Sequence, residues 1–245
     1  LLYVELESFV YYNPSKVSTV SELKTKVING LTTYGSSTDI NKFGGRFKYS
    51  KILNVIDNID DAITSNITRV RIRRNLKALV NQFAQYELCY GNPFHINPEG
   101  KNVKSTGFTI QGQSDMLYIT DIPNKNSDGS LDGSGKGTLT IVKGDAELSA
   151  NRLIVASAGT VDYVHGEIIL NTINFTSTER ANDIIEIQAF PQSNDVIGLK
   201  DLYLSFAIGD SEINMIKDTI TSGEQISGVG YKVTSSYSNG VLTRG

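Results

Sequence analysis

Within the first 75 residues the hydrophobic pattern switches from an alternating period to a helical one and back. Leu2–Glu7 alternates between apolar and other side chains, as a half-buried strand does. Apolar residues then recur at helical spacing over Val20–Tyr34 and again over Tyr49–Ile56. Alternation returns at Thr68–Arg73. This order predicts an α+β fold class that begins with a small β-α-α-β module over residues 1–75, with both helices on one face of two strands.

The ends of both helices are marked in the sequence. Thr19 and Glu22 fit a capping box, in which side-chain oxygens satisfy free N–H groups at a helix start, and Gly35 is a plausible stop. The pair Gly44-Gly45 permits a turn before the second helix, with room for a short strand near residues 46–48. Aspartates crowd the far end of the second helix and oppose its dipole, so we expect it to stop near residues 58–61.

From residue 76 to about residue 200 the pattern changes to short β-branched and aromatic runs between Gly, Asn, Asp and Pro. This predicts a β-rich domain, either a sandwich or a meander. Some helical spacing between Leu76 and Tyr86 leaves its first boundary open. The expected strands are Gln82–Cys89, Met116–Asp121, Gly137–Val142, Leu153–Ala156, Glu167–Leu170 and Ile184–Phe190.

Residues 201–245 form the third expected segment. Leu202–Ile208 alternates as a strand. Ser211–Thr221 fits a short helix and an extended segment equally well, and both readings stay open. The tail from Ser222 is rich in Gly, Ser and Tyr, which predicts loose packing or dependence on a partner.

Composition excludes several classes of protein. The 245 residues carry a net charge of −3, so no general attraction to nucleic acid or to an anionic membrane is expected. One cysteine and two histidines argue against an internal disulfide and a Cys/His metal site, and we expect no cofactor. The sequence contains no run of 18 apolar residues, so we expect no membrane-spanning helix. Because the chain starts inside an alternating pattern, we expect it to be a fragment of a longer polypeptide.

Two glycine-rich segments match known ligand-binding loop motifs in part. Asn124–Gly135 supplies oxygen ligands at calcium-loop spacing, but Gly135 occupies the position that needs a bidentate glutamate, and the flanks read as strands. Gly133–Thr138 resembles a phosphate loop, but lacks the first glycine and the final hydroxyl residue of that motif. A solvated hairpin loop is the favoured reading of both segments.

His165 is the strongest candidate for a catalytic group. It follows Asp162 closely and precedes Glu167, and a His/Asp pair can act as a general base. However, the neighbouring serine and threonine belong to a strand and turn without a nucleophile elbow, and His95 is isolated. We therefore expect ordinary turn residues, no catalytic residues and no enzyme.

Arg69, Arg71 and Arg73 form the charge pattern of most functional interest. Strand periodicity places the three side chains on one face, about 7 Å apart, a spacing that suits phosphates or a row of carboxylates. The acidic chain and the lack of interleaved aromatic residues favour a protein partner over nucleic acid. The aspartates that end the second helix are an alternative partner, and a solvated sheet face is the third reading.

Three stretches in the first 74 residues carry a family resemblance. "TVSELK", "FGGRFKYSKILNVIDNID" and "AITSNITRVRIRR", after the leading strand, resemble the C-terminal portion of the J-like baseplate wedge family, the large wedge protein of T-even-type contractile-tailed phages. "HGEIILNTINF" and "EIQAFPQSNDVIGLKDLYLSF" are similar to the β-rich end of marine relatives of that family.

The resemblance implies a structural subunit of the virion, located in the tail baseplate and assembled in the cytoplasm of the bacterial host. Such a subunit pairs with itself, as a homodimer, and with other wedge proteins in a ring that rearranges on contraction. An α+β unit with open strand edges suits docking against a copy of itself. We expect Arg69, Arg71, Arg73, Phe43 and Phe47 at that interface. The alternative is a β-rich module that binds a glycan or host surface through Asn124–Gly135 and Gly159–His165.

Overall fold

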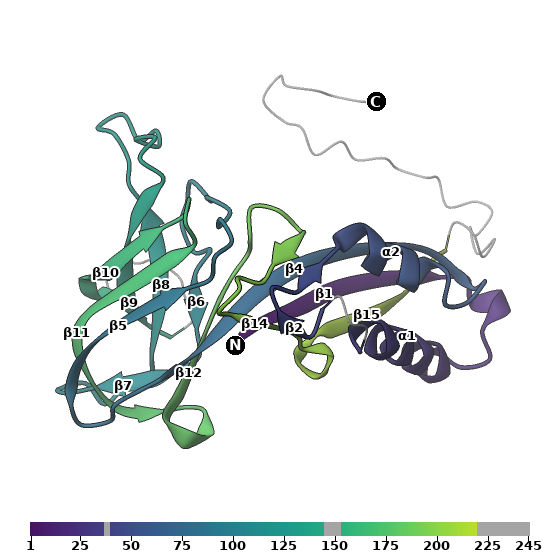
Figure 1. Ribbon diagram of the computed structural model, residues 1–245, viewed down its shortest axis with the longest axis horizontal. Helices are drawn as coiled ribbons and strands as arrows, with labels where there is room; N and C mark the ends of the chain where they lie inside the picture. Colours follow the sequence, from purple (N-terminus) through teal and green to yellow (C-terminus); the bar gives the residue numbers. More distant parts are fainter. Residues whose placement is uncertain (37–39, 145–152, 220–245) are drawn as a thin grey trace, which may run out of the picture.

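The computed structural model describes residues 1–36, 40–144 and 153–219. These residues form an elongated molecule with two lobes (Figure 1). The helical lobe holds the two α-helices of the described residues, and the β-rich lobe holds most of the short strands. The long strand β4 runs from one lobe into the other. The fold is therefore mixed but dominated by strands.

The helical lobe begins with β1 (Leu2–Tyr12), followed by the 3-10 turn η1 (Pro14–Lys16) and α1 (Val20–Gly35). The Thr19 hydroxyl accepts a hydrogen bond from the Glu22 N–H at 3.3 Å, so the predicted N-cap is confirmed, and α1 ends at the predicted glycine. Its buried side chains recur every four residues and pack against β1. The helical period in the sequence thus corresponds to the buried side of α1.

Helix α2 (Tyr49–Asp57) follows two short strands, β2 (Lys42–Phe43) and β3 (Arg46–Phe47). Its C-cap is Asn58, inside the predicted range. Asp60 then organises the turn: its carboxylate accepts from the Ala62 N–H at 3.0 Å and pairs with Lys26 of α1 at 2.6 Å. The turn is thereby tied to both helices.

Strand β4 (Ile63–Lys77) is longer than the alternation at Thr68–Arg73 suggests. Its first part pairs antiparallel with β1, and its last part pairs with β12 (Ile184–Ala189). The expected β-α-α-β order is present, with two further short strands between the helices, but the sheet is larger than the predicted pair of strands. Later segments complete its sheet, because both edges of the β1–β4 pair still offer backbone hydrogen-bonding groups.

Those segments are β14 (Tyr203–Phe206) and β15 (Glu212–Lys217), separated by the 3-10 turn η3 (Ile208–Asp210). Both strands pair in parallel with β1. The ambiguous segment Ser211–Thr221 is therefore extended over β15, and its helical reading is wrong there. Alignment beside β1 supplies backbone partners that a short isolated helix would lack. The tail from Ser222 lies outside the described residues.

The β-rich lobe contains all of the strands expected in it. The strands β8, β9, β10 and β11 pair in chain order as an antiparallel meander. Two of them, β10 and β11, extend well beyond their predicted ends at Ala156 and Leu170, and three short strands had no prediction. The bounds are β5 (Phe83–Cys89), β6 (Lys104–Ser105), β7 (Phe108–Ile110), β8 (Leu117–Pro123), β9 (Lys136–Lys143), β10 (Leu153–Asp162) and β11 (Glu167–Thr178), with the 3-10 turn η2 (Ala181–Asp183) before β12. The third short strand, β13 (Val196–Ile197), pairs with β3 of the helical lobe.

Buried side chains from both lobes belong to one hydrophobic cluster. It includes Val27 of α1, Ile52 of α2 and Ile72 of β4. It continues to Leu88 and Ile168 in the β-rich lobe. The divisions at residues 75 and 200 stay predictions, and β4 crosses the first of them. Neither described helix is long and apolar enough to cross a membrane.

Candidate functional site: an ion-paired sheet face

The sheet of the helical lobe has one covered face and one open face. Alternate residues of β1, such as Leu6 and Val10, are buried with residues of α1 and α2. The residues between them point to the other face, which no described helix covers. We define the open face by six residues: Glu7 and Phe9 of β1, Ile67, Arg69 and Arg71 of β4, and Glu212 of β15.

The arginine stripe lies on this side of β4, as predicted, but its members differ in exposure. Arg69 is exposed, Arg71 is half-buried and Arg73 is buried. The reading of the stripe as a solvated sheet face is therefore wrong for Arg73. The strand continues into the β-rich lobe at this point, so β12 and η3 lie beside Arg73 and exclude solvent from it.

Each arginine of the stripe pairs with a carboxylate of its own chain. Arg69 lies 3.8 Å from Glu7, and Arg71 lies 2.9 Å from Glu212. The aspartates that end α2 were an alternative partner for the stripe, and they bind elsewhere: Asp60 pairs with Lys26, and Asp57 accepts from Asn66 at 2.7 Å. An intrachain partner was thus a correct alternative, but the predicted residues were wrong.

Arg73 is the centre of a buried ion-pair network. Its guanidinium binds Glu5 of β1, Glu186 of β12 at 2.8 Å and Asp210 of η3 at 2.6 Å. The ring of Tyr3 lies 4.4 Å from the guanidinium carbon. One side chain thereby joins four segments that are distant in sequence, which no local pattern indicates.

Burial and charge act in opposite directions in this network. Burial raises the pKa of Glu5, while the hydrogen bond and charge of Arg73 lower it; burial prevails, helped by the like charge of Asp210. For Arg73, burial lowers the pKa, but its three carboxylates together raise it. Arg73 therefore stays charged, and Glu5 is the member of the pair whose ionisation is costly.

The two phenylalanines predicted at an interface occupy different environments. Phe43 is 61 % exposed, with its ring edge-on to Tyr203. Phe47 is 1 % exposed and packs edge-on against Phe206 in the core, so it does not present a surface in this structure. The alternation of β3 turns Phe47 inward between two exposed basic residues, Arg46 and Lys48.

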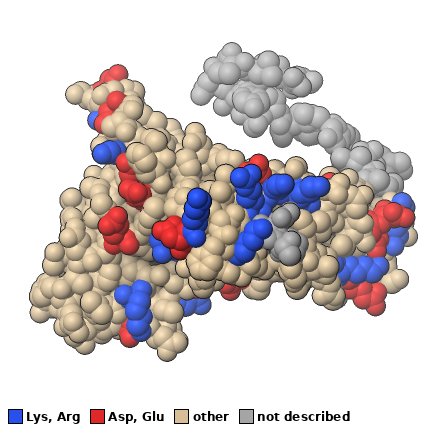
Figure 2. Space-filling view, in the orientation of Figure 1, with Lys and Arg blue, Asp and Glu red and all other residues tan. Residues whose placement is uncertain are grey.

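A second basic area lies on the side of the lobe shown in Figure 2. Lys and Arg side chains gather there over α2 and the short strands before it. The exposed basic residues of these elements are Lys42, Arg46, Lys48 and Lys51. They are spread over two short strands, the N-cap of α2 and α2 itself, so neither alternation nor helical spacing identifies them as a group.

The loop Asn124–Gly135 forms a hairpin tip between β8 and β9. Its two aspartates are bound by the loop itself: Asp128 accepts from the N–H and hydroxyl of Ser130, and Asp132 does the same with Ser134. These hydrogen bonds lower the pKa of both carboxyls. Among the described residues, no group of three or more His, Cys, Asp or Glu is placed to hold a metal ion.

The His165–Asp162 pair lies in the turn between β10 and β11. The imidazole Nδ1 is 3.1 Å from Asp162, and the backbone N–H groups of Val164 and His165 also donate to that carboxylate. The His165 side chain is 69 % exposed. The pair therefore stabilises a tight turn at the surface.

Comparison with known families gives a match over the first part of the chain. Residues 1–75 match the family model described as baseplate structural protein gp6, C-terminal domain III. No curated protein matches the chain. The matched segment comprises β1, α1, α2 and most of β4, and it includes all three stripe arginines. The match supports a structural component of a phage tail baseplate that contacts other baseplate proteins, with residues 76–245 outside it.

Proposed function

We propose that the chain is a structural subunit of the baseplate wedge of a contractile phage tail. The match of residues 1–75 to a baseplate structural domain carries this proposal. According to this proposal, the chain corresponds to the C-terminal portion of a J-like wedge protein from a marine relative and is assembled in the host cytoplasm. It acts through protein interfaces and not by catalysis, binding itself and other wedge proteins in the ring around the tail hub.

The baseplate location has a direct test in virions of the phage that encodes the chain. Tails are purified with and without their baseplates, and peptides from residues 1–75 are quantified by mass spectrometry. The proposal expects these peptides in the baseplate-bearing fraction and a loss of at least about tenfold from stripped tails. Equal amounts in both fractions, or none in either, would contradict it.

The open face supports the self-association part of the proposal, because its charges are self-complementary. The register places Glu7 of β1 beside Arg69 of β4, and Arg71 of β4 pairs with Glu212 of β15. Phe9 lies beside Ile67, which is 56 % exposed. The face therefore combines an apolar pair with two pairs of opposite charge.

A two-fold axis that runs parallel to β1 and β4, midway between them, would bring complementary side chains of two copies together. It would place Glu7 of each copy over Arg69 of the other and Phe9 over Ile67, as an isologous contact requires. Two sheets packed in this way lie about 10 Å apart and bury their facing side chains. Arg69 would then contact Glu7 of its own chain and Glu7 of the second copy.

Charge exchange tests this arrangement. The variants Glu7→Arg and Arg69→Glu each place like charges across the proposed interface, so each should sediment as a monomer when alone. A 1:1 mixture restores both opposite-charge contacts in a mixed dimer. Sedimentation velocity of the wild type, each variant and the mixture, at equal total concentration, measures the outcome. Because mixing leaves the contacts within each chain unchanged, recovery of a dimer cannot result from improved folding.

The outcomes separate the parts of the proposal. A wild-type chain that is monomeric at all concentrations would contradict self-association while leaving the baseplate location intact. A wild-type dimer with variants that also dimerise would contradict the use of the open face. Monomeric variants whose mixture dimerises would support both.

A further inference from the structure

Strand β11 changes partners along its length, and a pocket lies at the change. Its first residues pair with β10, and its last residues pair with β7. Between these ladders, at Asn171–Asn174, the neighbouring strands separate around a pocket of about 240 Å³. The Asn171 side-chain amide reaches across, donating to the Ser157 carbonyl of β10 at 3.4 Å. The pocket is therefore a consequence of the sheet topology.

The described lining of this pocket carries no ionisable side chain. Aliphatic residues, Ile173 and Val155 among them, form part of the wall. Phe83 of β5, the register partner of Asn174, contributes an aromatic ring and is 69 % exposed. A large exposed aromatic side chain beside an aliphatic wall favours contact with an apolar ligand surface.

The polar part of the lining consists of amides and hydroxyls. The Asn174 amide nitrogen donates to Gln111 Oε1 at 3.2 Å. Its Oδ1 is buried and accepts no hydrogen bond from any described residue. A buried acceptor without a donor is costly, and this one belongs to a residue that lines the pocket. Gln111, Asn171 and Ser157 add further donors and acceptors around it.

We propose that this pocket binds one ring of a neutral saccharide. A pyranose has an apolar face that stacks on an aromatic ring and hydroxyls that suit amide donors and acceptors. The uncharged lining disfavours acidic sugars, phosphates and charged peptides, because no described side chain there would compensate their charge. A few placed polar groups on a largely apolar wall are typical of a small-molecule site.

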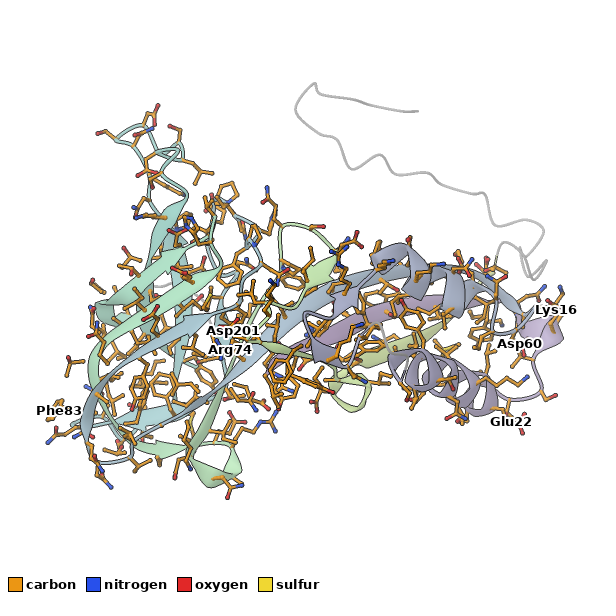
Figure 3. The ribbon with its side chains drawn as sticks, viewed as in Figure 1. Lys16, Glu22, Asp60, Arg74, Phe83 and Asp201 are labelled. Atoms are coloured by element: carbon orange, nitrogen blue, oxygen red, sulfur yellow. The ribbon has the colours of Figure 1, made fainter. Side chains whose placement is uncertain are left out.

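The position of the pocket allows binding without interference with the matched segment. Phe83 lies at the outer end of the β-rich lobe, while Glu22 and Asp60 mark the opposite end of the molecule (Figure 3). A chain attached through its helical lobe would leave the pocket free. This inference goes beyond the structural role proposed above and does not depend on it.

Saturation-transfer difference NMR tests the inference on the whole chain. The probes are the methyl glycosides of glucose, galactose and mannose, and N-acetylglucosamine, each at 10 mM as a chosen screening concentration. N-acetylneuraminic acid and glucose 6-phosphate serve as charged controls. We expect transfer to at least one neutral probe and none to the charged ones. The Phe83→Ala variant should weaken binding by roughly tenfold, the upper range for an aromatic contact.

Two matched variants make the result specific. Phe83→Tyr keeps an aromatic ring and should retain binding. Phe43→Ala removes a similarly exposed phenylalanine, 61 % against 69 %, from the other lobe and should leave binding unchanged. Absence of transfer to every neutral probe, or equal transfer in the wild type and Phe83→Ala, would overturn the inference. So would transfer to the charged controls that matches transfer to the neutral sugars.

Discussion

Arg73 of β4 and Glu5 of β1 form an ion pair in which each side chain is only 6 % exposed. Glu186 and Asp210, from β12 and η3, bind the same guanidinium. Arg73 therefore links the segment that matches a baseplate domain to a strand and a turn more than 100 residues later in the chain.

We predict that Arg73→Met destabilises the protein by about 3–5 kcal/mol, because it leaves Glu5 buried without a cation. Arg69→Met removes the same chemical group from an exposed pair and should cost less than about 1 kcal/mol. Urea unfolding gives both free energies. The double variant Glu5→Gln/Arg73→Met should recover part of the lost free energy of unfolding. An equal cost for Arg73→Met and Arg69→Met would show that the buried network stabilises the protein no more than an exposed ion pair.

A second prediction separates the two phenylalanines. Phe47→Ala should cost about 3–5 kcal/mol, because it opens a cavity against Phe206 in the core. Phe43→Ala should change the free energy of unfolding by about 0.5 kcal/mol or less, since most of its ring is exposed. Thermal unfolding of the two variants beside the wild type measures the contrast, and similar melting temperatures for both would refute it.

The third prediction concerns the start of α1. Thr19→Ala should cost about 1 kcal/mol, because the Glu22 N–H loses its side-chain acceptor. Thr25→Ala is the matched control in the exposed middle of the same helix, where alanine is the better helix former and the effect should be neutral or slightly stabilising. Both are measured by chemical denaturation. A destabilisation of the same size at both positions would mean that the cap has no role.

The fourth prediction is a pH dependence at Asp121, whose carboxylate is fully buried and accepts from the Tyr163 hydroxyl at 2.6 Å and the Val103 N–H at 2.6 Å. Burial raises its pKa above the ordinary value of 3.8, despite these hydrogen bonds. The folded protein therefore holds this proton more tightly than the unfolded chain. Its stabilising effect is full below pH 3.8 and is lost as pH rises through the raised pKa.

The comparison uses Asp121→Asn, which cannot ionise. The stability of the wild type relative to this variant should fall as pH rises from about 3.5 toward 7. Asp128→Asn should show the opposite sign, since hydrogen bonds from Ser130 lower the pKa of that exposed carboxyl and its contribution is lost as pH falls. Urea unfolding across this range gives both curves. A pH-independent difference for Asp121→Asn would contradict the raised pKa.

Local signals in the sequence predicted the parts of the fold that depend on near neighbours. Helix α1 has its cap and stop where the capping box and the glycine indicate, and α2 ends within one residue of its predicted range. The β-rich strands also lie where the short apolar runs are. What alternation missed was strand length: β10 and β11 continue through residues with weak patterns, because the neighbouring strands there satisfy their backbones.

The candidate site was predictable only in part. Alternation placed the stripe arginines on one face, and a similar alternation near Leu1 put Glu5 and Glu7 together. No local signal gives the register that sets Glu7 beside Arg69, or the passage of β12 and η3 over Arg73. The open acceptor of Asn174 likewise arises from a change of strand partners.

By itself, the sequence determined both α-helices with their ends, the longer strands and the family resemblance of its first segment, because periodicity, capping and turn chemistry act over a few residues. Tertiary structure alone decided that Ser211–Thr221 contributes a strand, that Phe47 and Arg73 are buried, and that the two lobes have one core. These outcomes depend on contacts between residues far apart in the chain. Such contacts decide burial and register, since a charge or an edge strand is stable only where a distant segment supplies its partner.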